Sequence, residues 1–229
     1  MYGPGVVCLR CGETGHYAPD CPNAASKRAK PDESTSTDAA MVVTPYYNKP
    51  TQEGLYQHFS AIADAVPLPV VLYNVPGRTV VDLLPETVGR LAAHPLIVAL
   101  KEATGSVERI VELKAQVPGD FALLSGEDGM NVVLMEAGCV GVISVTANVV
   151  PAALAKVCEA ALAGDFATAR ALDAPLTALH EALFLEPNPI PVKWALAAMG
   201  RVEGGLRLPL TPLSESAQAP LRAALAGLG

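Results

Sequence analysis

From about residue 38 onward, short apolar runs alternate with stretches in which apolar residues recur every three to four positions. Such runs predict buried strands, and such stretches predict helices with one apolar face. We expect strands at 41–44, 70–74, 97–101, 121–125 and 140–144. We expect helices at 51–66 and 85–93, another with Val107, Ile110, Val111 and Leu113 on one face, and mainly helices after Pro151.

The predicted strands are apolar along their whole length. Strands of this kind are usually covered on both faces, which favours a parallel sheet with helical crossovers. The sequence therefore indicates an α/β fold with five βα units. Periodicity alone leaves open whether these units form an open doubly wound sheet or part of an eight-stranded barrel.

Composition divides the chain into three zones. Residues 1–23 are rich in Cys and Gly, residues 24–37 contain no large apolar residue, and residues 38–229 carry the strands and helices. The middle zone has nothing to bury and is predicted to be a flexible linker. Of the five cysteines, Cys139 and Cys158 lie far apart in apolar stretches, which is typical of core residues in a reducing compartment.

Charge and hydropathy exclude several classes of protein. A net charge of −7 argues against a nucleic-acid binder as a whole, because phosphate recognition needs clustered Lys and Arg. No apolar run reaches the ~18–20 residues of a membrane span. The first residues lack the basic and apolar regions of a secretory signal. These observations predict a cytoplasmic protein with no membrane partner.

Polar clusters follow four of the five predicted strands, at the edge where reactive groups gather in βα folds. Lys101 comes directly after four apolar residues. Burial favours the neutral amine of a lysine, which attacks carbonyl groups. The alternative from position alone is a lysine that reaches solvent or pairs with Glu102.

Two further side chains follow the second strand. Tyr73 is a candidate proton donor and acceptor if it points the same way as Lys101, and otherwise a tyrosine at the edge of the core. Arg78 lies on a Pro-Gly turn, where its planar guanidinium is suited to a carboxylate. A surface arginine without a function is the alternative.

Four segments closely resemble the 4-hydroxy-tetrahydrodipicolinate synthase (dihydrodipicolinate synthase) family, in order and in spacing. They are VTPYYNKP at 43–50, YNVPGRT at 73–79, KEATG at 101–105 and NPIPVK at 188–193. The resemblance implies a (β/α)8 TIM barrel with added C-terminal helices, assembled as a homotetramer. It also implies a carbon–oxygen lyase that condenses pyruvate with L-aspartate 4-semialdehyde in the diaminopimelate route of lysine biosynthesis.

The same resemblance implies roles for individual residues. Lys101 forms a Schiff base with pyruvate without any cofactor, Tyr73 moves protons, and Tyr47 completes a proton relay into a neighbouring subunit. Substrate contacts fall to Arg78, Ile143 and Gly126, and Tyr46 lines the pocket for feedback inhibition by lysine. N-acetylneuraminate lyase shares the lysine and tyrosine chemistry, but the Pro-Gly-Arg-Thr turn fits the synthase better.

The matched region begins at what corresponds to the fourth barrel strand, so strands 4–8 form an incomplete barrel. A Gly-Thr-Thr-Gly-Glu segment, which in the family supplies a relay hydroxyl and binds the pyruvate carboxylate, is absent from the sequence. Five strands cannot close an eight-stranded barrel. We expect exposed inward faces at Val42, Leu72 and Leu100, little activity of this chain alone, and a tendency to aggregate.

The N-terminal zone contains a C-x2-C-x4-H-x4-C pattern, made by Cys8, Cys11, His16 and Cys21. Three thiolates and an imidazole suit tetrahedral Zn²⁺, and metal binding supplies the folding energy of so short a segment. The pattern resembles the CCHC zinc knuckle family, which implies binding to single-stranded RNA or DNA. The alternative function is therefore a zinc-dependent nucleic-acid binder that carries an inactive barrel remnant.

Basic and aromatic residues near the knuckle bear on that alternative. Leu9 and Tyr17 are candidates for contacts with unstacked bases, and Arg10 with the Lys27–Lys30 cluster for contacts with phosphates. A solvated run of charge in a linker explains the cluster equally well.

Overall fold

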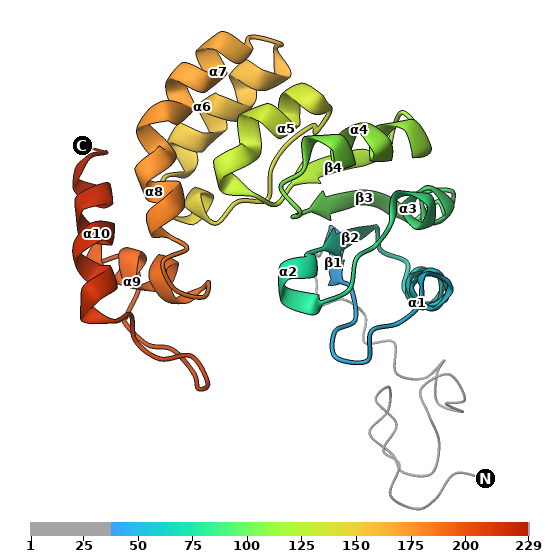
Figure 1. The fold of residues 1–229 in the computed structure, drawn as a ribbon, viewed down its shortest axis with the longest axis horizontal. Helices are drawn as coiled ribbons and strands as arrows, with labels where there is room; N and C mark the ends of the chain where they lie inside the picture. Colours follow the sequence, from blue (N-terminus) through green and yellow to red (C-terminus); the bar gives the residue numbers. More distant parts are fainter. Residues whose placement is uncertain (1–37, 229) are drawn as a thin grey trace, which may run out of the picture. The chain divides into compact units, whose positions relative to one another are not determined.

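The computed structural model describes residues 38–228, in which a parallel sheet is followed by a group of helices (Figure 1). The strands are β1 (Ala40–Val43), β2 (Val70–Asn74), β3 (Ile97–Glu102) and β4 (Ala122–Ser125). The helices are α1 (Gln52–Ala65), α2 (Pro76–Thr79), α3 (Pro85–Leu91), α4 (Val107–Gln116), α5 (Asn131–Ala137), α6 (Pro151–Leu162), α7 (Phe166–Asp173), α8 (Thr177–Ala182), α9 (Ile190–Ala198) and α10 (Glu215–Ala226).

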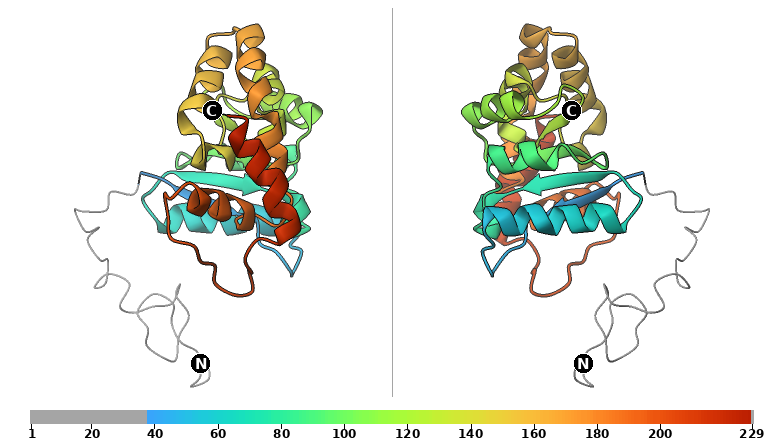
Figure 2. Two further views of the ribbon diagram at one scale, coloured as in Figure 1. Left: turned by 90° about the vertical axis from the view of Figure 1, so that its left-hand side faces the viewer. Right: turned by 90° about the vertical axis from the view of Figure 1, so that its right-hand side faces the viewer.

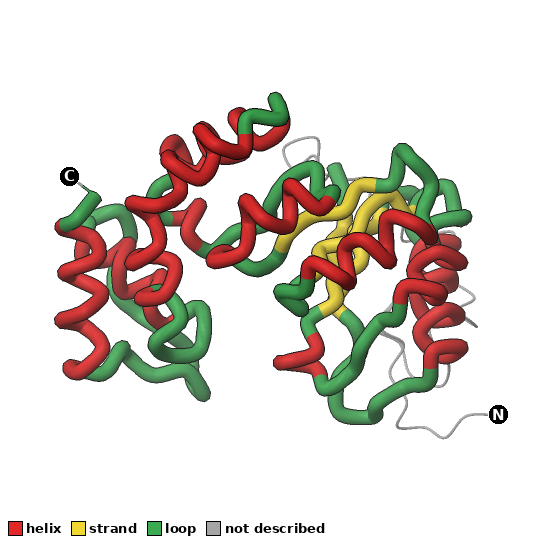
Figure 3. Tube along the Cα trace, turned by 45° about the horizontal axis from the view of Figure 1, so that its top comes forward, coloured by secondary structure: helices red, strands yellow, loops and turns green. Residues whose placement is uncertain are grey.

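The four strands are hydrogen-bonded in chain order and are all parallel. Parallel neighbours need a crossover connection, and α1, α3 and α4 lie in these connections (Figure 3). Two adjacent rows of side chains cross the sheet: Val42, Leu72, Leu100 and Leu123 in one, and Val43, Tyr73, Lys101 and Leu124 in the next. Successive positions of a strand point to opposite faces, so these rows lie on opposite sides of the sheet.

The row through Leu72 and Leu100 faces the helices. Both side chains are fully buried in the main hydrophobic cluster, against which Val42 also packs. The expectation that Val42, Leu72 and Leu100 face the barrel interior was therefore wrong by one position. On β1 the opposite face carries Met41 and Val43, which are 49% and 37% exposed.

Local sequence explains where the crossover helices begin. Thr51 Oγ1 accepts a hydrogen bond from the backbone N–H of Gly54 (3.2 Å), and Ser106 Oγ accepts one from Arg109 (3.1 Å). These are N-caps, which satisfy amides that have no partner inside the helix. From α1, Leu55, Phe59 and Ala63 enter the core at intervals of four residues. The helices predicted at 51–66 and 85–93 are confirmed, each slightly shorter than expected.

The predicted strand at 140–144 is not a regular strand. Only one bridge forms there, between Val142 and Ser125. The backbone still runs beside β4, because Val140 N–H donates to Leu123, Ser125 N–H to Gly141 and Ile143 N–H to Ser125, at 2.8–2.9 Å. The ladder ends there because the next amides are bound by side chains rather than by a neighbouring strand.

The C-terminal helices form a second hydrophobic cluster. Its buried members come mainly from α8, α9 and α10, with Leu179, Leu183 and Leu221 fully buried. Figure 2 shows α10 toward the viewer in one view and α1 toward the viewer in the opposite view, so these helices lie at opposite ends of the described residues. This arrangement matches the helices predicted after Pro151.

Cys139 is buried, as expected of a core residue, and burial raises the pKa of its thiol to about 12. Burial also raises the pKa of Cys158, which is half-buried. Among residues 38–228, no helix is long and apolar enough to cross a membrane. The residues predicted to form the zinc knuckle and the linker lie outside the described part of the chain.

Candidate active site

Lys101 and Tyr73 are neighbours across two parallel strands. The register places Tyr73 of β2 opposite Lys101 of β3, on the face away from the helices. The Lys101 ammonium nitrogen lies 4.3 Å from the centre of the Tyr73 ring. Both side chains end at the carboxyl edge of the sheet, where catalytic groups gather in βα folds. Their predicted proximity is confirmed.

The surroundings of Lys101 favour its neutral amine. Burial lowers the pKa of Lys101, the nearby Arg78 charge lowers it further, and Asp128 opposes them. Burial also raises the pKa of Tyr73, so its hydroxyl holds its proton at neutral pH. A neutral amine beside a protonated phenol is suited to attack on a carbonyl followed by proton transfer.

Glu102, the alternative partner of Lys101, points to the other side of the sheet. Its carboxylate accepts hydrogen bonds from Asn74 Nδ2 (3.0 Å) and from the backbone N–H of Thr104 (2.8 Å). Among the described residues, no hydrogen bond or ion pair joins Glu102 to Lys101. The structure therefore disfavours an ion pair as the role of Lys101.

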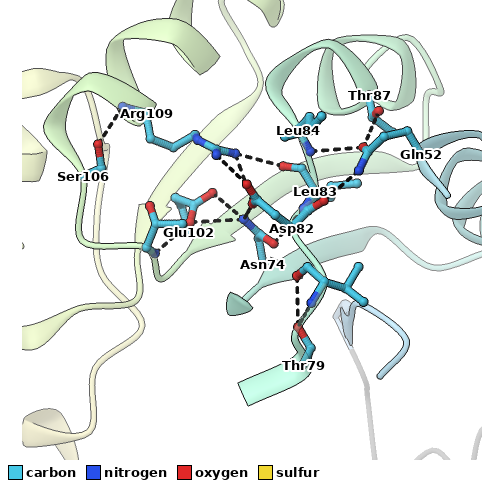
Figure 4. A network of polar contacts seen from close by, with 12 residues as sticks. Gln52, Asn74, Thr79, Asp82, Leu83, Leu84, Thr87, Glu102, Ser106 and Arg109 are labelled. Atoms are coloured by element: carbon cyan, nitrogen blue, oxygen red, sulfur yellow. Dashed lines mark hydrogen bonds and ion pairs between the residues drawn. The ribbon is translucent and has the colours of Figure 1, made fainter. Parts of the chain in front are cut away.

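Behind the sheet, Glu102 belongs to a network of polar contacts (Figure 4). Asn74 Nδ2 also donates to Asp82 Oδ1 (2.8 Å), and Asn74 Oδ1 accepts from the backbone N–H of Leu83 (3.0 Å). Arg109 pairs with Asp82 through Nη2 at 2.6 Å and Nη1 at 3.2 Å. The network ties the ends of β2 and β3 to the 80–84 loop and to α4, so it holds the strand ends that carry Tyr73 and Lys101.

A cleft of about 570 Å³ opens at these strand ends. Tyr73, Arg78, Lys101, Gly126 and Glu127 line one part of it. Residues 184–188, from the connection between α8 and α9, line another part. The exposed Arg78 sits on α2 and also lines the cleft, and its role in binding a carboxylate stays a prediction. The cleft thus brings together a buried amine, a phenol and a guanidinium.

Lys101 also lines a second cleft of about 330 Å³. Ile143, Ser144 and Val145 form one wall of it, and Asn188 and Lys193 contribute to another. Ile143, predicted to contact pyruvate, therefore lies in a cleft that Lys101 shares. Lys101 stands between the two clefts.

Gly126 is required by the close approach of Lys101. A Cβ atom added at this position would lie 2.9 Å from Lys101 Cε and 2.9 Å from Ala103 Cβ. Its backbone N–H donates to the Glu102 carbonyl (2.8 Å). Gly126 was predicted as a substrate contact, and it lines the larger cleft, but its clearest role is to leave room for the lysine side chain.

Asp128 was not singled out from the sequence, although it lies in the polar cluster after the fourth strand. It is 3% exposed, and Oδ2 accepts from the backbone N–H groups of Val145 (2.9 Å) and Thr146 (3.0 Å). Asn131 donates to Oδ1 (3.2 Å). Asp128 therefore fixes the wall at 143–146 and places a negative charge near Lys101.

Tyr46 and Tyr47 are not brought to Lys101 within this chain. They lie on the loop after β1 and are 70% and 92% exposed. Neither lines either cleft beside Lys101. Tyr47 has a positive φ of 66°, which is uncommon for a residue with a side chain. Their predicted roles concern a neighbouring subunit and a regulatory pocket, and both stay predictions.

The metal ligands predicted from the sequence, Cys8, Cys11, His16 and Cys21, lie outside the described residues. Within residues 38–228, no group of three or more His, Cys, Asp or Glu side chains is arranged to hold a metal ion.

Two known families match this sequence. The Dihydrodipicolinate synthetase family matches residues 21–227. The Zinc knuckle family matches residues 6–23. Both agree with the resemblances drawn from the motifs.

Curated relatives carry one name. The 4-hydroxy-tetrahydrodipicolinate synthase of Alcanivorax borkumensis is 62% identical over 185 residues, which are 81% of this chain and 63% of the relative. The protein of the same name from Teredinibacter turnerae is 58% identical over 192 residues, 84% of this chain and 66% of the relative. The chain therefore spans just under two thirds of the length of these relatives.

Solved structures agree with the fold. The chloride-inhibited dihydrodipicolinate synthase of Acinetobacter baumannii, solved with pyruvate, has a TM-score of 0.81 and 55% identity, covering 83% of this chain and 66% of that chain. The enzyme of Aquifex aeolicus has a TM-score of 0.82 and 44% identity, covering 84% and 66%. At these identities the likeness concerns sequence as well as fold.

Proposed function

Because the chain belongs to the Dihydrodipicolinate synthetase family, we propose that it captures pyruvate as a Schiff base on Lys101. The imine then condenses with L-aspartate 4-semialdehyde to give 4-hydroxy-tetrahydrodipicolinate, a step of lysine biosynthesis. The observation that carries the proposal is the half-buried Lys101 amine, whose pKa is lowered by burial, 4.3 Å from the Tyr73 ring at the edge of a cleft.

The chemistry follows from a neutral amine in this place. Lys101 Nζ attacks the keto carbon of pyruvate, and the carbinolamine loses water to give a protonated imine. The imine withdraws electrons from the methyl carbon, which gives up a proton and becomes an enamine nucleophile. The enamine attacks the aldehyde carbon of the second substrate and forms the new carbon–carbon bond. None of these steps needs a metal ion.

Neighbouring residues supply the remaining roles. The Tyr73 hydroxyl accepts and returns protons at the imine, because it is the phenol nearest to Lys101 in the cleft. Arg78, at the rim of the same cleft, holds the carboxylate of the semialdehyde. The backbone at Ile143 contacts pyruvate, and Gly126 leaves room for the amine.

We further propose that residues 38–229 correspond to strands 4–8 and the C-terminal helices of a (β/α)8 barrel, after a knuckle at 1–23 and a linker at 24–37. The match to just under two thirds of the relatives supports this assignment. Imine formation draws on residues within the match. Full turnover by this chain alone is expected to be low, because the Gly-Thr-Thr-Gly-Glu segment is absent from the sequence.

Reductive trapping tests the proposal. Pyruvate and borohydride should convert Lys101 to a secondary amine whose mass gain is one pyruvate minus water plus two hydrogens. Peptide mapping should place the label on Lys101 and leave Lys193 of the neighbouring cleft unlabelled. Adding L-aspartate 4-semialdehyde before borohydride should reduce the label, whereas N-acetylmannosamine should not. A wild-type chain that gains no label would overturn the proposal.

The exposed aromatic loop after β1 favours assembly with copies of the same chain. Tyr46 and Tyr47 expose large aromatic surface, which is typical of interface residues. We propose that Tyr47 completes a proton relay in the site of a neighbouring copy within a homotetramer. Sedimentation velocity of the wild type and of Tyr47→Ser tests this: the variant should shift toward smaller species, and an unchanged distribution would contradict the interface.

The match to the Zinc knuckle family supports a second candidate function at the other end of the chain. We propose that Cys8, Cys11, His16 and Cys21 bind Zn²⁺ and that the loaded segment binds single-stranded RNA or DNA. The expected result is zinc-dependent, salt-sensitive binding to a labelled single-stranded oligonucleotide, lost in Cys11→Ser and kept in Cys139→Ser. Binding that persists after zinc removal would refute this candidate.

A further inference from the structure

A row of three hydrogen-bonded side chains, Asp173, His180 and Thr146, lies behind the wall of the two clefts. Asp173 Oδ1 is 3.2 Å from His180 Nε2, and His180 Nδ1 is 2.8 Å from Thr146 Oγ1. Thr146 is fully buried and His180 is 4% exposed. Asp173 ends α7, His180 lies on α8, and Thr146 follows the wall at 143–145. These three side chains thus link two helices to the segment beside Lys101.

The carboxylate of Asp173 indicates which atoms donate in these hydrogen bonds. An ionised carboxylate only accepts hydrogen bonds, so His180 donates from Nε2 to Asp173. In the neutral tautomer with its proton on Nε2, Nδ1 is an acceptor and the Thr146 hydroxyl donates to it. This fixes the Thr146 side chain in one direction, toward α8.

The wall at 143–145, together with Thr146 after it, depends on side chains for its conformation. Regular pairing with β4 ends at Ile143, whose N–H donates to Ser125. The next amides are bound by side chains: Val145 and Thr146 donate to Asp128, and Ala147 donates to Ser144 Oγ (3.0 Å). Asp128 holds this wall on one side and His180 holds it on the other.

A direct catalytic role does not fit this Asp-His-Thr chain, although its residue types resemble those of a hydrolase. Neither Thr146 nor His180 lines the clefts at Lys101. With the hydroxyl fully buried, no substrate atom reaches it. Thr146 and His180 can act on the site only through the neighbouring residues at 143–145.

We propose that His180 is a positioning residue for the imine-forming site. Through its contact with Thr146 it fixes Ile143, Ser144 and Val145 as the wall shared by the clefts on either side of Lys101. The inference rests on the function proposed above, because this wall is the surface that contacts pyruvate. Loosening it weakens pyruvate binding while the amine of Lys101 stays in place.

Two pairs of variants separate positioning from simple stability. Thr146→Val keeps the shape of the side chain without its hydroxyl, and Thr146→Ser keeps the hydroxyl. His180→Gln places an amide near the Nε2 position and retains the contact with Asp173, whereas His180→Asn places one near Nδ1 and retains the contact with Thr146. His94→Gln is the matched control, because His94 also contacts an aspartate, Asp64, at 3.2 Å and lines neither cleft.

The main measurement is the pyruvate dependence of borohydride trapping in the full chain. Thr146→Val and His180→Gln should raise the half-saturating pyruvate concentration about fivefold to tenfold, as expected for one lost buried hydrogen bond, with the limiting trapping rate within about twofold. Thr146→Ser, His180→Asn and His94→Gln should stay near the wild type. A merely structural role would lower the folded fraction and leave the half-saturating concentration unchanged.

Hydrogen–deuterium exchange of a peptide covering 143–148 is the second measurement. It should be faster in Thr146→Val and His180→Gln and unchanged in the three other variants. Wild-type exchange and wild-type saturation in Thr146→Val would overturn the inference, as would an equal effect of His94→Gln. If the wild type takes no pyruvate label, the proposed function fails, and exchange alone then decides whether His180 holds the wall.

Discussion

Adjacent residues of β3 serve opposite purposes on the two sides of the sheet. Glu102 is 1% exposed and bound by Asn74 and Thr104, within a network in which each charge has a partner. Lys101 makes no hydrogen bond or ion pair among the described residues, and it faces a cleft of about 570 Å³. A buried carboxyl group with hydrogen-bonded oxygens is compatible with a stable fold, whereas a half-buried amine without a partner is available for chemistry. The network holds the strand ends that carry Tyr73 and Lys101, and these two residues line the cleft.

The largest expected effect is the loss of chemistry in Lys101→Met. The variant should form no pyruvate adduct, because no other described amine lies next to Tyr73. Its free energy of unfolding should also rise by about 1 kcal/mol, because a desolvated amine is replaced by an apolar side chain of similar length. The variant should therefore unfold at a higher temperature. Mass spectrometry after trapping and thermal unfolding are the measurements. Lys156→Met on the exposed face of α6 is the control, and equal labelling of Lys101→Met would contradict the site.

Asn74→Leu removes contacts from the polar network behind the sheet. It removes a donor to Asp82 and Glu102 and an acceptor for Leu83 N–H. Leaving these groups unsatisfied should cost about 3–4 kcal/mol of unfolding free energy. Urea unfolding measures the loss, and Gln57→Leu, which removes only an exposed contact with Glu53, should change it by less than about 0.5 kcal/mol. A loss as small as the control's would mean that the network does not hold the strand ends.

Tyr73→Phe separates imine formation from proton transfer. The ring still packs beside Lys101, so pyruvate labelling should persist. Exchange of the pyruvate methyl protons into D₂O, followed by NMR, should slow about 100-fold, the usual contribution of a positioned proton-transfer group. Tyr56→Phe on α1 is the control. Unchanged methyl exchange would remove Tyr73 from the mechanism.

Gly126→Ala tests the packing between the two sides. The added methyl group would meet Lys101 Cε and Ala103 Cβ at 2.9 Å, so the amine must shift. We expect trapping at Lys101 to slow about tenfold, because small displacements of a reacting group are costly. Gly129→Ala is a matched control, since a Cβ there meets nothing within 4 Å. Equal rates in the two variants would show that the lysine has room to spare.

The smallest expected effect is a pH dependence of stability from Glu102. Burial raises the pKa of Glu102 above its ordinary value of 4.5, so the folded chain keeps this proton to a higher pH than the unfolded chain. The resulting stabilisation is complete below pH 4.5 and is lost as pH rises through the folded pKa. Relative to Glu102→Gln, the wild type should therefore lose stability as pH rises through this window. Urea unfolding at several pH values measures it, with Glu159→Gln as control, and a pH-independent difference would contradict the raised pKa.

Much of the architecture was predictable because it depends on local patterns. The strand ending at Lys101 and the helix at 51–66 follow from apolar runs, helical spacing and the Thr51 cap. The candidate residues Lys101, Tyr73 and Arg78 followed from polar groups at strand ends and from the family motifs. These signals lie within a few residues of one another, so one sequence is enough to read them.

Other features were missed because they depend on distant pairs. The contact between Thr146 and His180 joins residues 34 positions apart, and the bond from Asp128 to Thr146 joins residues 18 positions apart. A buried histidine on an apolar helix carries no local sign of its partner. The single bridge at Val142 was likewise hidden, because the apolar run at 140–144 is the same whether or not the ladder continues.

Sequence alone predicted the first four strands with their crossover helices in chain order, and it singled out Lys101 as the candidate amine. The tertiary structure decided on which face each side chain lies. Strand positions alternate, so an assignment displaced by one residue exchanges the two faces, as happened for Leu72 and Leu100. The register with neighbouring strands removes this ambiguity, and it places Tyr73 with Lys101 in the cleft and Glu102 in the network behind it.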